Sequence, residues 1–244
     1  MTSGRSLLLI ADIGGYTEYM RSHRMSLAHA EVNTSRLLEK VIDAAPGFDL
    51  IEIEGDAAFL ARDADAMDRE ATVALTLQAA TSMHRAFHRE RQYVATNLCP
   101  CKSCTEANNL KLKFVAHSGE VATQTIRQRR KLVGIDVILV HRLLKNAVDV
   151  PEYVLVSEEL YRSGDTALPG PTHQVSQDLE GIGPVVAHYV DVADLAGAFP
   201  ALPKPSVLGR LGKTLSVAGA GLPYMVGLRR PRREAAAHRG AWTA

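Results

Sequence analysis

Continuous and alternating apolar runs divide the first 195 residues into short strands and helices. The unbroken apolar run within 6–13 is typical of a strand that is buried on both faces. Leu37, Leu38, Val41 and Ile42 recur at helical spacing, which predicts a helix over 31–45. The predicted elements are, in chain order, a strand at 6–13, helices at 16–30 and 31–45, strands at 49–54 and 57–62, a long helix at 66–92, strands at 110–121 and 123–131, a helix at 134–147, a strand at 152–156, a short helix at 158–163, and strands at 171–178 and 185–192. This order predicts an α+β fold with a ferredoxin-like sheet and helices on one face.

The domain organisation follows from composition. With 244 residues, of which 46% are hydrophobic and 23% charged, the chain can bury one sizeable core. Pro200, Pro203 and Pro205 mark the end of the folded part. We therefore expect one domain over 1–195, into which a cysteine-containing loop at 96–109 is inserted, and a C-terminal tail over 196–244.

The net charge of +1 conceals a basic tail. From Lys204 onward there are eight basic residues and one acidic residue, so the tail is strongly basic and the rest of the chain is acidic. The uncharged stretch 214–228 is followed by the basic cluster 229–233 and is too short to span a bilayer. The tail is open to three interpretations: a disordered segment, one that contacts an acidic partner, or one that binds a membrane surface. No specific recognition of nucleic acid is predicted.

The N-terminus contains no signal-peptide pattern, and all three cysteines lie between residues 99 and 104, which is not a secreted disulfide framework. These features favour a cytoplasmic protein, membrane-peripheral if the tail binds lipid.

Two aspartates stand at the ends of predicted strands. Asp12 precedes the turn Ile13-Gly14-Gly15, and Asp56 ends the sequence 52–56. A carboxylate at the end of a buried strand needs compensation, and a divalent cation such as Mg²⁺ or Mn²⁺ is a common answer. Glycines ahead of a helix leave backbone N–H groups free to face an anion. The pair suggests a site for nucleotide phosphates, although each aspartate is also a common helix cap or turn residue.

Four motifs follow one another along residues 5–192. They are 9–17 with Asp12, 52–56 with Asp56, 113–121 with His117, and 134–143 with Arg142. In this order they resemble the class III adenylate and guanylate cyclases, and most closely a divergent, uncharacterised bacterial branch of that superfamily. The resemblance implies a βααββαβ cyclase-type sheet. It also implies a homodimer and a purine nucleoside triphosphate, ATP or GTP, as ligand.

The resemblance assigns a role to each matching position. It implies that Asp12 and Asp56 hold two Mg²⁺ or Mn²⁺ ions and that the backbone of Ile13, Gly14 and Gly15 meets the phosphates. It places Glu52 at a purine-reading position, where a carboxylate is the guanine-type choice; a solvent-facing strand residue is the alternative. It makes Arg142 a catalytic residue that acts across the dimer.

Three positions depart from the family pattern. Ile138 stands where the family has an asparagine, Glu180 where it has a phosphate-binding lysine, and Lys131 fits neither purine class. Losing one preorganised transition-state donor commonly lowers the rate by about 10²–10³. We therefore expect weak or lost cyclase activity. The basic run 127–131 either supplies the missing positive charge or forms a solvated hairpin tip.

The motif Cys99-x-Cys101-x-x-Cys104 brings three soft ligands together on one loop. Zinc takes four ligands, and His84 and His88, one helical turn apart on the preceding helix, are candidates for the fourth. A redox-sensitive thiol group and an inert loop are the alternatives.

The sequence leaves three classes of function open. The chain is a metal-dependent nucleotidyl cyclase or related enzyme, a cyclase-fold domain that binds nucleotide without turnover, or a signalling or scaffold protein whose cysteine loop and basic tail bind partners.

Overall fold

The computed structural model describes residues 3–23, 27–98, 101–162 and 168–196. The predicted basic tail and Cys99 lie outside these ranges. The helices are α1 (Tyr16–Ser22), α2 (Leu27–Asp43), α3 (Arg69–Asn97), α4 (Lys102–Glu106), the 3₁₀ helix η2 (Ala107–Asn109), α5 (Ile135–Leu143), α6 (Glu158–Arg162) and α7 (Val192–Ala196). The strands are β1 (Ser3–Gly14), β2 (Asp49–Glu54), β3 (Ala57–Asp63), β4 (Lys111–Ile126), β5 (Arg129–Val133), β6 (Tyr153–Ser157), β7 (His173–Leu179) and β8 (Gly183–Asp191).

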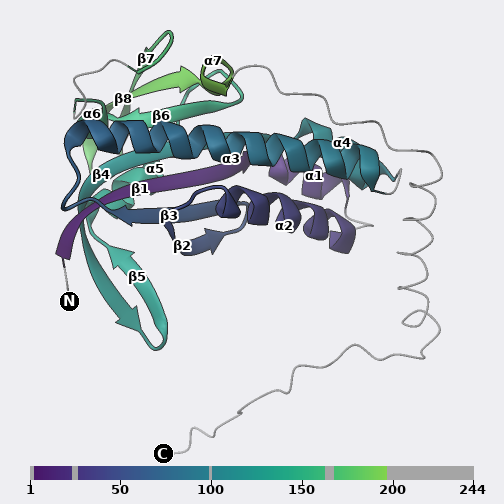
Figure 1. Ribbon diagram of the computed structural model, residues 1–244, viewed down its shortest axis with the longest axis horizontal. Helices are drawn as coiled ribbons and strands as arrows, with labels where there is room; N and C mark the ends of the chain where they lie inside the picture. Colours follow the sequence, from purple (N-terminus) through teal and green to yellow (C-terminus); the bar gives the residue numbers. More distant parts are fainter. Residues whose placement is uncertain (1–2, 24–26, 99–100, 163–167, 197–244) are drawn as a thin grey trace, which may run out of the picture.

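The strands form one eight-stranded sheet, in which seven follow the order β2-β3-β1-β4-β6-β8-β7 (Figure 1). The eighth strand, β5, pairs with the C-terminal part of β4, from Ala122 to Ile126. The β4–β6 pair is parallel and the other pairs are antiparallel. The predicted α+β class with a ferredoxin-like sheet is confirmed.

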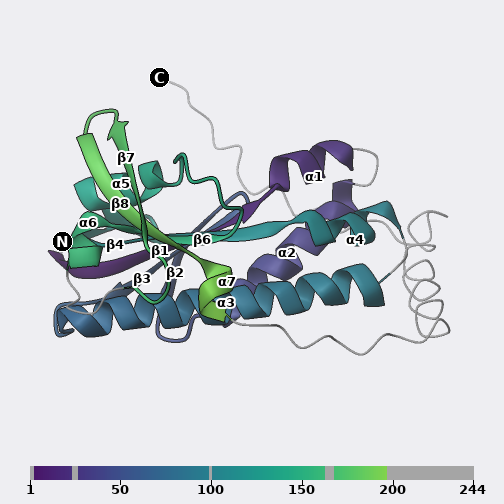
Figure 2. The same ribbon diagram turned by 90° about the horizontal axis from the view of Figure 1, so that it is seen from above.

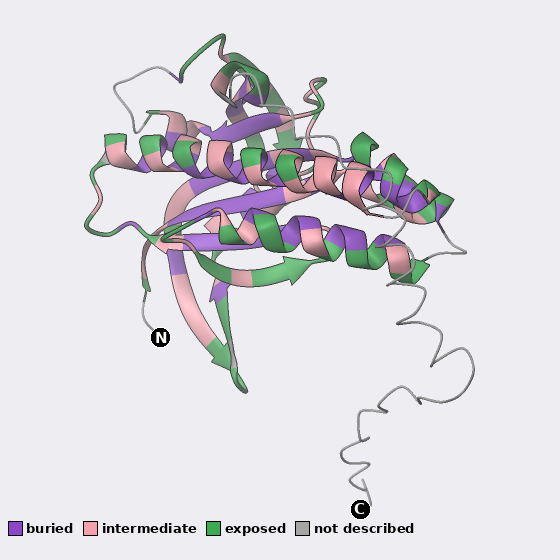
Figure 3. Cartoon of the chain, turned by 45° about the vertical axis from the view of Figure 1, so that its right-hand side comes forward, coloured by how far each residue is buried: buried purple, intermediate pink, exposed green. Residues whose placement is uncertain are grey.

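The central strand β1 separates two apolar layers, because successive side chains point to opposite faces of a sheet. Leu7 and Leu9 pack in the layer that includes residues of α2 and α3, whereas Leu8 and Ile10 pack in the layer that includes residues of α5. Figure 2 shows α2 and α3 together on one side of the sheet and the shorter α5 on the other. The central strands are buried, and the far end of the β4–β5 hairpin is exposed (Figure 3).

Several boundaries differ from the predicted ones. The helices predicted over 16–30 and 134–147 end earlier, at Ser22 and Leu143, and the strand predicted over 123–131 is divided between β4 and β5. Two of the differences have local reasons. The long helix begins at Arg69, because the side chain of Asp68 caps it by accepting a hydrogen bond of 2.6 Å from the backbone N–H of Ala71. Strand β4 continues to Ile126, and the chain reverses at Arg127, whose φ of 57° is left-handed. The basic run 127–131 therefore forms the tip and first strand residues of a hairpin, as one of its two interpretations predicted.

Candidate functional site

The two aspartates meet at one end of the sheet. Asp12 lies near the end of β1, opposite Ala57 on β3 and Lys113 on β4. The backbone N–H of Ile13 donates a hydrogen bond of 3.1 Å to the carbonyl of Asp56, which ties the β2–β3 turn to the end of β1. The fold thus brings together two residues that are 44 positions apart in the sequence.

The carboxylates of Asp12 and Asp56 are close enough for the charge of one to shift the pKa of the other. Burial raises the pKa of Asp56, and the negative charge of Asp12 raises it further. The Lys113 ammonium lies 2.9 Å from Oδ2 of Asp12. Burial acts to lower the pKa of Lys113, but its hydrogen bond to Asp12 and the nearby acidic charge raise the pKa overall. Two carboxylates and one ammonium therefore share a partly buried site.

The two carboxylates of this site favour a bound divalent cation, whereas the ammonium of Lys113 opposes it. An ion near Asp12 and Asp56 would relieve the repulsion that raises the pKa of Asp56. Lys113 already neutralises part of the charge on Asp12 and would compete with that ion. Sequence reasoning did not select Lys113, since only the antiparallel register of β1 and β4 places it beside Asp12.

The glycine turn after Asp12 has the predicted form. Gly15 has a φ of 83°, which L side chains rarely adopt, and a Cβ there would lie 3.7 Å from the carbonyl oxygen of Asn109. The carbonyl of Gly15 accepts the first hydrogen bond of α1, from the N–H of Tyr19 at 3.0 Å. Because α1 has only seven residues, backbone N–H groups rather than a helix dipole are what this turn offers to an anion.

The two candidate base-reading positions line one hollow. Glu52 on β2 and Lys131 on β5 are both exposed and both border the hollow between β2 and the β4–β5 hairpin. Leu50, Ile53 and Ile126 add apolar surface to the same hollow and are about half exposed. The hollow therefore combines apolar surface with one carboxylate and several basic groups.

Helix α5 carries the candidate catalytic residue. Arg142 is partly buried in its last turn. The neighbouring His141 lies 3.3 Å from a carboxylate oxygen of Glu54 and packs against the ring of Phe59, which anchors this turn to β2 and β3. Ile138, one turn earlier, is 47% exposed and has no hydrogen-bonding group to offer.

Glu180 lies at the opposite end of the sheet from Asp12. It is exposed in the turn between β7 and β8. Strand β8 runs from this turn to Asp191, which pairs with Tyr153 beside the Lys113 end of β4. Eight residues of extended strand separate the two ends of β8, or roughly 26 Å. Glu180 and Asp12 of one chain therefore cannot act on the same phosphate group.

His117, in the third motif, has a structural role. It is 1% exposed on β4, and its Nδ1 lies 2.7 Å from the hydroxyl of Ser157 while its Nε2 lies 3.1 Å from Asp136. Asp136 also accepts a hydrogen bond of 2.6 Å from the backbone N–H of Glu120. Ser157 is buried as well, so this Ser-His-Asp arrangement joins α5 and β6 to β4 and has no access to a substrate.

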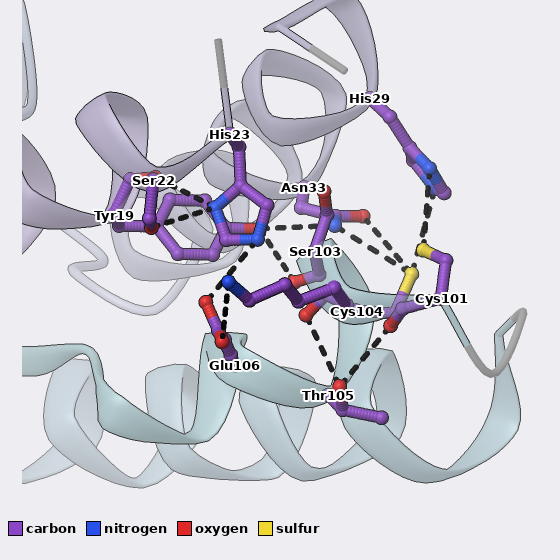
Figure 4. Close-up of polar contacts among 11 residues, drawn as sticks. Tyr19, Ser22, His23, His29, Asn33, Cys101, Ser103, Cys104, Thr105 and Glu106 are labelled. Carbon is purple, nitrogen blue, oxygen red and sulfur yellow. Dashed lines mark hydrogen bonds and ion pairs between the residues drawn. The ribbon is translucent and has the colours of Figure 1, made fainter. Parts of the chain in front are cut away.

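The cysteine loop has a different histidine beside it from those expected. His84 and His88 of α3 both face Glu152, with Nε2 to carboxylate distances of 3.4 and 2.8 Å. The histidine next to the cysteines is His29 of α2, which approaches Cys101 and Cys104 (Figure 4). The assignment of His84 and His88 to the cysteine site is therefore corrected, because both rings lie beside Glu152 and form a separate cluster with it. The motif pointed to the cysteines, but nothing in the local sequence distinguishes His29.

Comparison with solved structures identifies the class of fold. The crystal structure of the guanylyl cyclase Cya2 superposes with a TM-score of 0.59 at 17% identity, covering 77% of this chain and 92% of that chain. The adenylyl cyclase CyaB from P. aeruginosa gives 0.57 at 17% identity, covering 78% and 95%. The guanylate cyclase domain of RhGC from Catenaria anguillulae, in complex with GTP, gives 0.56 at 15% identity, covering 78% and 97%. The chain has the fold of class III cyclase catalytic domains.

Sequence comparison identifies the family. The family described as a protein of unknown function (DUF2652) matches residues 34–153. The uncharacterized protein Rv2561/Rv2562 of Mycobacterium tuberculosis is 38% identical over 197 residues, which cover 80% of this chain and 90% of that protein. The chain belongs to the same family as this mycobacterial protein.

Among the described residues, no helix combines the length and the apolar character needed to cross a membrane.

Proposed function

We propose that this protein binds a purine nucleoside triphosphate together with Mg²⁺ or Mn²⁺ at Asp12 and Asp56, and that it turns the nucleotide over weakly or not at all. The observation that supports this proposal is the pair of electrostatically coupled carboxylates at the end of β1, next to the Gly14–Gly15 turn. When bound, a divalent ion would neutralise phosphate charge and could activate the ribose hydroxyl.

Different residues of the chain would contact different parts of the nucleotide. Asp12 and Asp56 would hold the metal. The backbone of the turn after Ile13, at Gly14 and Gly15, would face the phosphates, because the N–H of Ile13 itself already donates to the carbonyl of Asp56. Lys113 would exchange its ion pair with Asp12 for contact with a phosphate oxygen, which restores its charge balance. Glu52 would meet the base, and the guanine edge offers the donors that a carboxylate accepts.

The positions of α5 and of the β7–β8 turn support the predicted homodimer. Because Glu180 is about 26 Å from the Asp12 end of its own sheet, a site that used both ends of the sheet would need a second copy in a head-to-tail arrangement. The exposed Ile135 and Ile138 of α5 and the apolar rim of the β2–β5 hollow would supply the contact surface. In that dimer, Arg142 of one copy would approach the phosphates held by the other.

The nucleotide proposal is tested by thermal unfolding with ATP or GTP, with and without Mn²⁺. Nucleotide at about 100 times its dissociation constant stabilises by about 2.7 kcal/mol, or roughly 5–10 °C for a chain of this size. Asp56→Asn should abolish the Mn²⁺-dependent shift. It should leave the melting temperature of the unliganded protein unchanged or slightly higher, because it removes a carboxylate whose ionisation burial disfavours.

The matched control is Asp178→Asn, which changes an exposed aspartate on β7 at the other edge of the sheet. It should keep the full shift. An equal Mn²⁺-dependent shift in Asp56→Asn and the unmodified protein would place the metal elsewhere and contradict the proposal.

The dimer is tested by sedimentation velocity at micromolar concentration with nucleotide present. We expect a dimer for the unmodified chain and a monomer for Ile138→Glu, because a carboxylate on the exposed face of α5 would be desolvated at the contact. The control Val32→Glu makes the same change at another exposed β-branched residue, on α2 and outside the proposed contact. This variant should remain dimeric. A strictly monomeric unmodified protein would remove Arg142 from the proposed site.

A further inference from the structure

Three soft or borderline metal ligands converge where α4 meets α2. Cys101 is the N-cap of α4 and Cys104 lies in its first turn, so the two sulfurs face the same side. His29 of α2 presents Nδ1 at 3.5 Å from Sγ of Cys101 and Nε2 at 3.4 Å from Sγ of Cys104. Figure 4 shows both sulfurs gathered beside the His29 ring. One donor atom from each residue lies within 4.8 Å of the others.

Each of these separations is close to that between two ligands of one zinc ion, but the two sulfurs approach different nitrogens of the His29 ring. Zinc binds sulfur at about 2.3 Å and imidazole nitrogen at about 2.0–2.1 Å, so tetrahedral geometry places the two donor atoms about 3.6 Å apart. The observed nitrogen–sulfur distances of 3.4 and 3.5 Å match this value. A ring rotation would direct one nitrogen at the point between the two sulfurs. The Cys-x-x-Cys spacing is also that of many structural zinc sites.

A hydrogen-bond donor, the amide of Asn33, lies beside the sulfur of Cys104. The Cys104 side chain is completely buried, and the amide of Asn33 lies with Nδ2 3.6 Å from its sulfur. The same amide donates to the hydroxyl of Tyr19 at 3.2 Å, and that hydroxyl donates to the carbonyl of Ser103 at 2.7 Å. Such outer hydrogen bonds orient metal ligands and stabilise a sulfur that carries negative charge. The network joins α1, α2 and α4 around the site.

We propose that His29, Cys101 and Cys104 bind a structural zinc ion that fastens α4 to α2. The fourth position is filled by a ligand outside this group, water included. The chain that follows α4 reaches Asn109, whose carbonyl lies against Gly15. Zinc therefore also stabilises the segment on which the Gly14–Gly15 turn rests. The site is separate from Asp12 and Asp56, and it stands whether or not the protein binds nucleotide.

The test is the zinc content of the full chain, purified under reducing conditions and dialysed after incubation with zinc. We expect about one zinc per chain, and a thiolate-to-cobalt charge-transfer band after cobalt replaces zinc. His29→Gln and Cys104→Ser should each lower the retained zinc at least tenfold and remove the band. His29 is only partly buried, so His29→Gln keeps the test valid if Cys104→Ser fails to fold.

Two variants serve as controls. His173→Gln removes an exposed histidine on β7 and should retain zinc. Asp56→Asn should retain zinc although it loses Mn²⁺-dependent nucleotide binding, which separates failure of this proposal from failure of the nucleotide proposal. The proposal is overturned if the unmodified chain retains no zinc, if His29→Gln retains as much as His173→Gln, or if Cys101 and Cys104 form a disulfide that excludes metal under the same reducing conditions.

Discussion

We expect the purified protein to form cyclic nucleotide at least ~100-fold more slowly than an active class III cyclase domain. In the proposed dimer, Ile138 would offer no hydrogen bond to the transition state, and Glu180 would place negative charge where phosphate charge has to be neutralised. Lys113 adds a third reason, because its ion pair with Asp12 must be broken before a metal can use that carboxylate. Each lost or opposed interaction is commonly worth about 10²–10³ in rate. The measurement is chromatographic detection of cyclic AMP and cyclic GMP after incubation with ATP or GTP and Mn²⁺.

The double variant Ile138→Asn with Glu180→Lys should raise this rate, because it supplies a donor on α5 and reverses the charge in the β7–β8 turn. The matched control is Ile135→Asn with Glu180→Lys, which places the same amide one turn earlier on α5, on an isoleucine that is 58% exposed against 47% for Ile138. It should not raise the rate as far. Robust cyclic nucleotide formation by the unmodified protein would contradict this prediction and would point to the basic hairpin 127–131 as the source of the missing positive charge.

The second prediction with a large expected effect is that Glu152 stabilises the folded chain. Its carboxylate is 15% exposed, and Nε2 of His88 and Nε2 of His84 lie 2.8 and 3.4 Å from its oxygens. The backbone N–H of Leu112 donates a hydrogen bond of 2.9 Å to the same carboxylate. Burial alone would raise the pKa of Glu152, but the hydrogen bonds from these groups outweigh it and hold the pKa well below its usual range. Glu152→Gln should lower the free energy of unfolding by about 3 kcal/mol, since charge-assisted bonds are lost around buried histidines. The melting temperature should fall by roughly 6–12 °C.

The same cluster predicts the direction of the pH dependence. Because the pKa of Glu152 is lower in the folded chain than its ordinary 4.5, the unfolded chain takes up the proton first, and stability is lost as the pH falls below about 4.5. Burial lowers the pKa of His88 below its ordinary 6.5, so acidification below about 6.5 also favours the unfolded chain.

The measurement is urea unfolding at a series of pH values from about 7 down to about 2, so that it covers the loss of the His88 contribution below about 6.5 and of the Glu152 contribution below about 4.5. Glu152→Gln should flatten the acid limb, whereas Glu39→Gln, at an exposed position on α2, should leave both the stability and its pH profile unchanged. An identical acid limb in Glu152→Gln and the unmodified protein would show that Glu152 does not carry the acid sensitivity.

The sequence by itself determined the order and type of the main strands and helices, although not the short helices α4, η2 and α7. The apolar run before Asp12 and the Gly55-Asp56 turn are local signals, because strand burial and turn geometry depend on neighbouring residues. The cyclase-type sheet was predicted from the resemblance of the ordered motifs to class III cyclases. The two aspartates were selected in the same way, since a charged residue at the end of an apolar strand is visible without any tertiary contact.

Only the tertiary structure decided which side chains meet. Lys113 joins Asp12 through strand register, and His29 joins Cys101 and Cys104 because α2 crosses the loop that carries them. The i, i+4 spacing of His84 and His88 correctly put them on one face of α3 but could not show that this face meets Glu152. These contacts join residues 64 to 101 positions apart in the chain. They depend on how whole elements pack, and a local sequence pattern does not specify that packing.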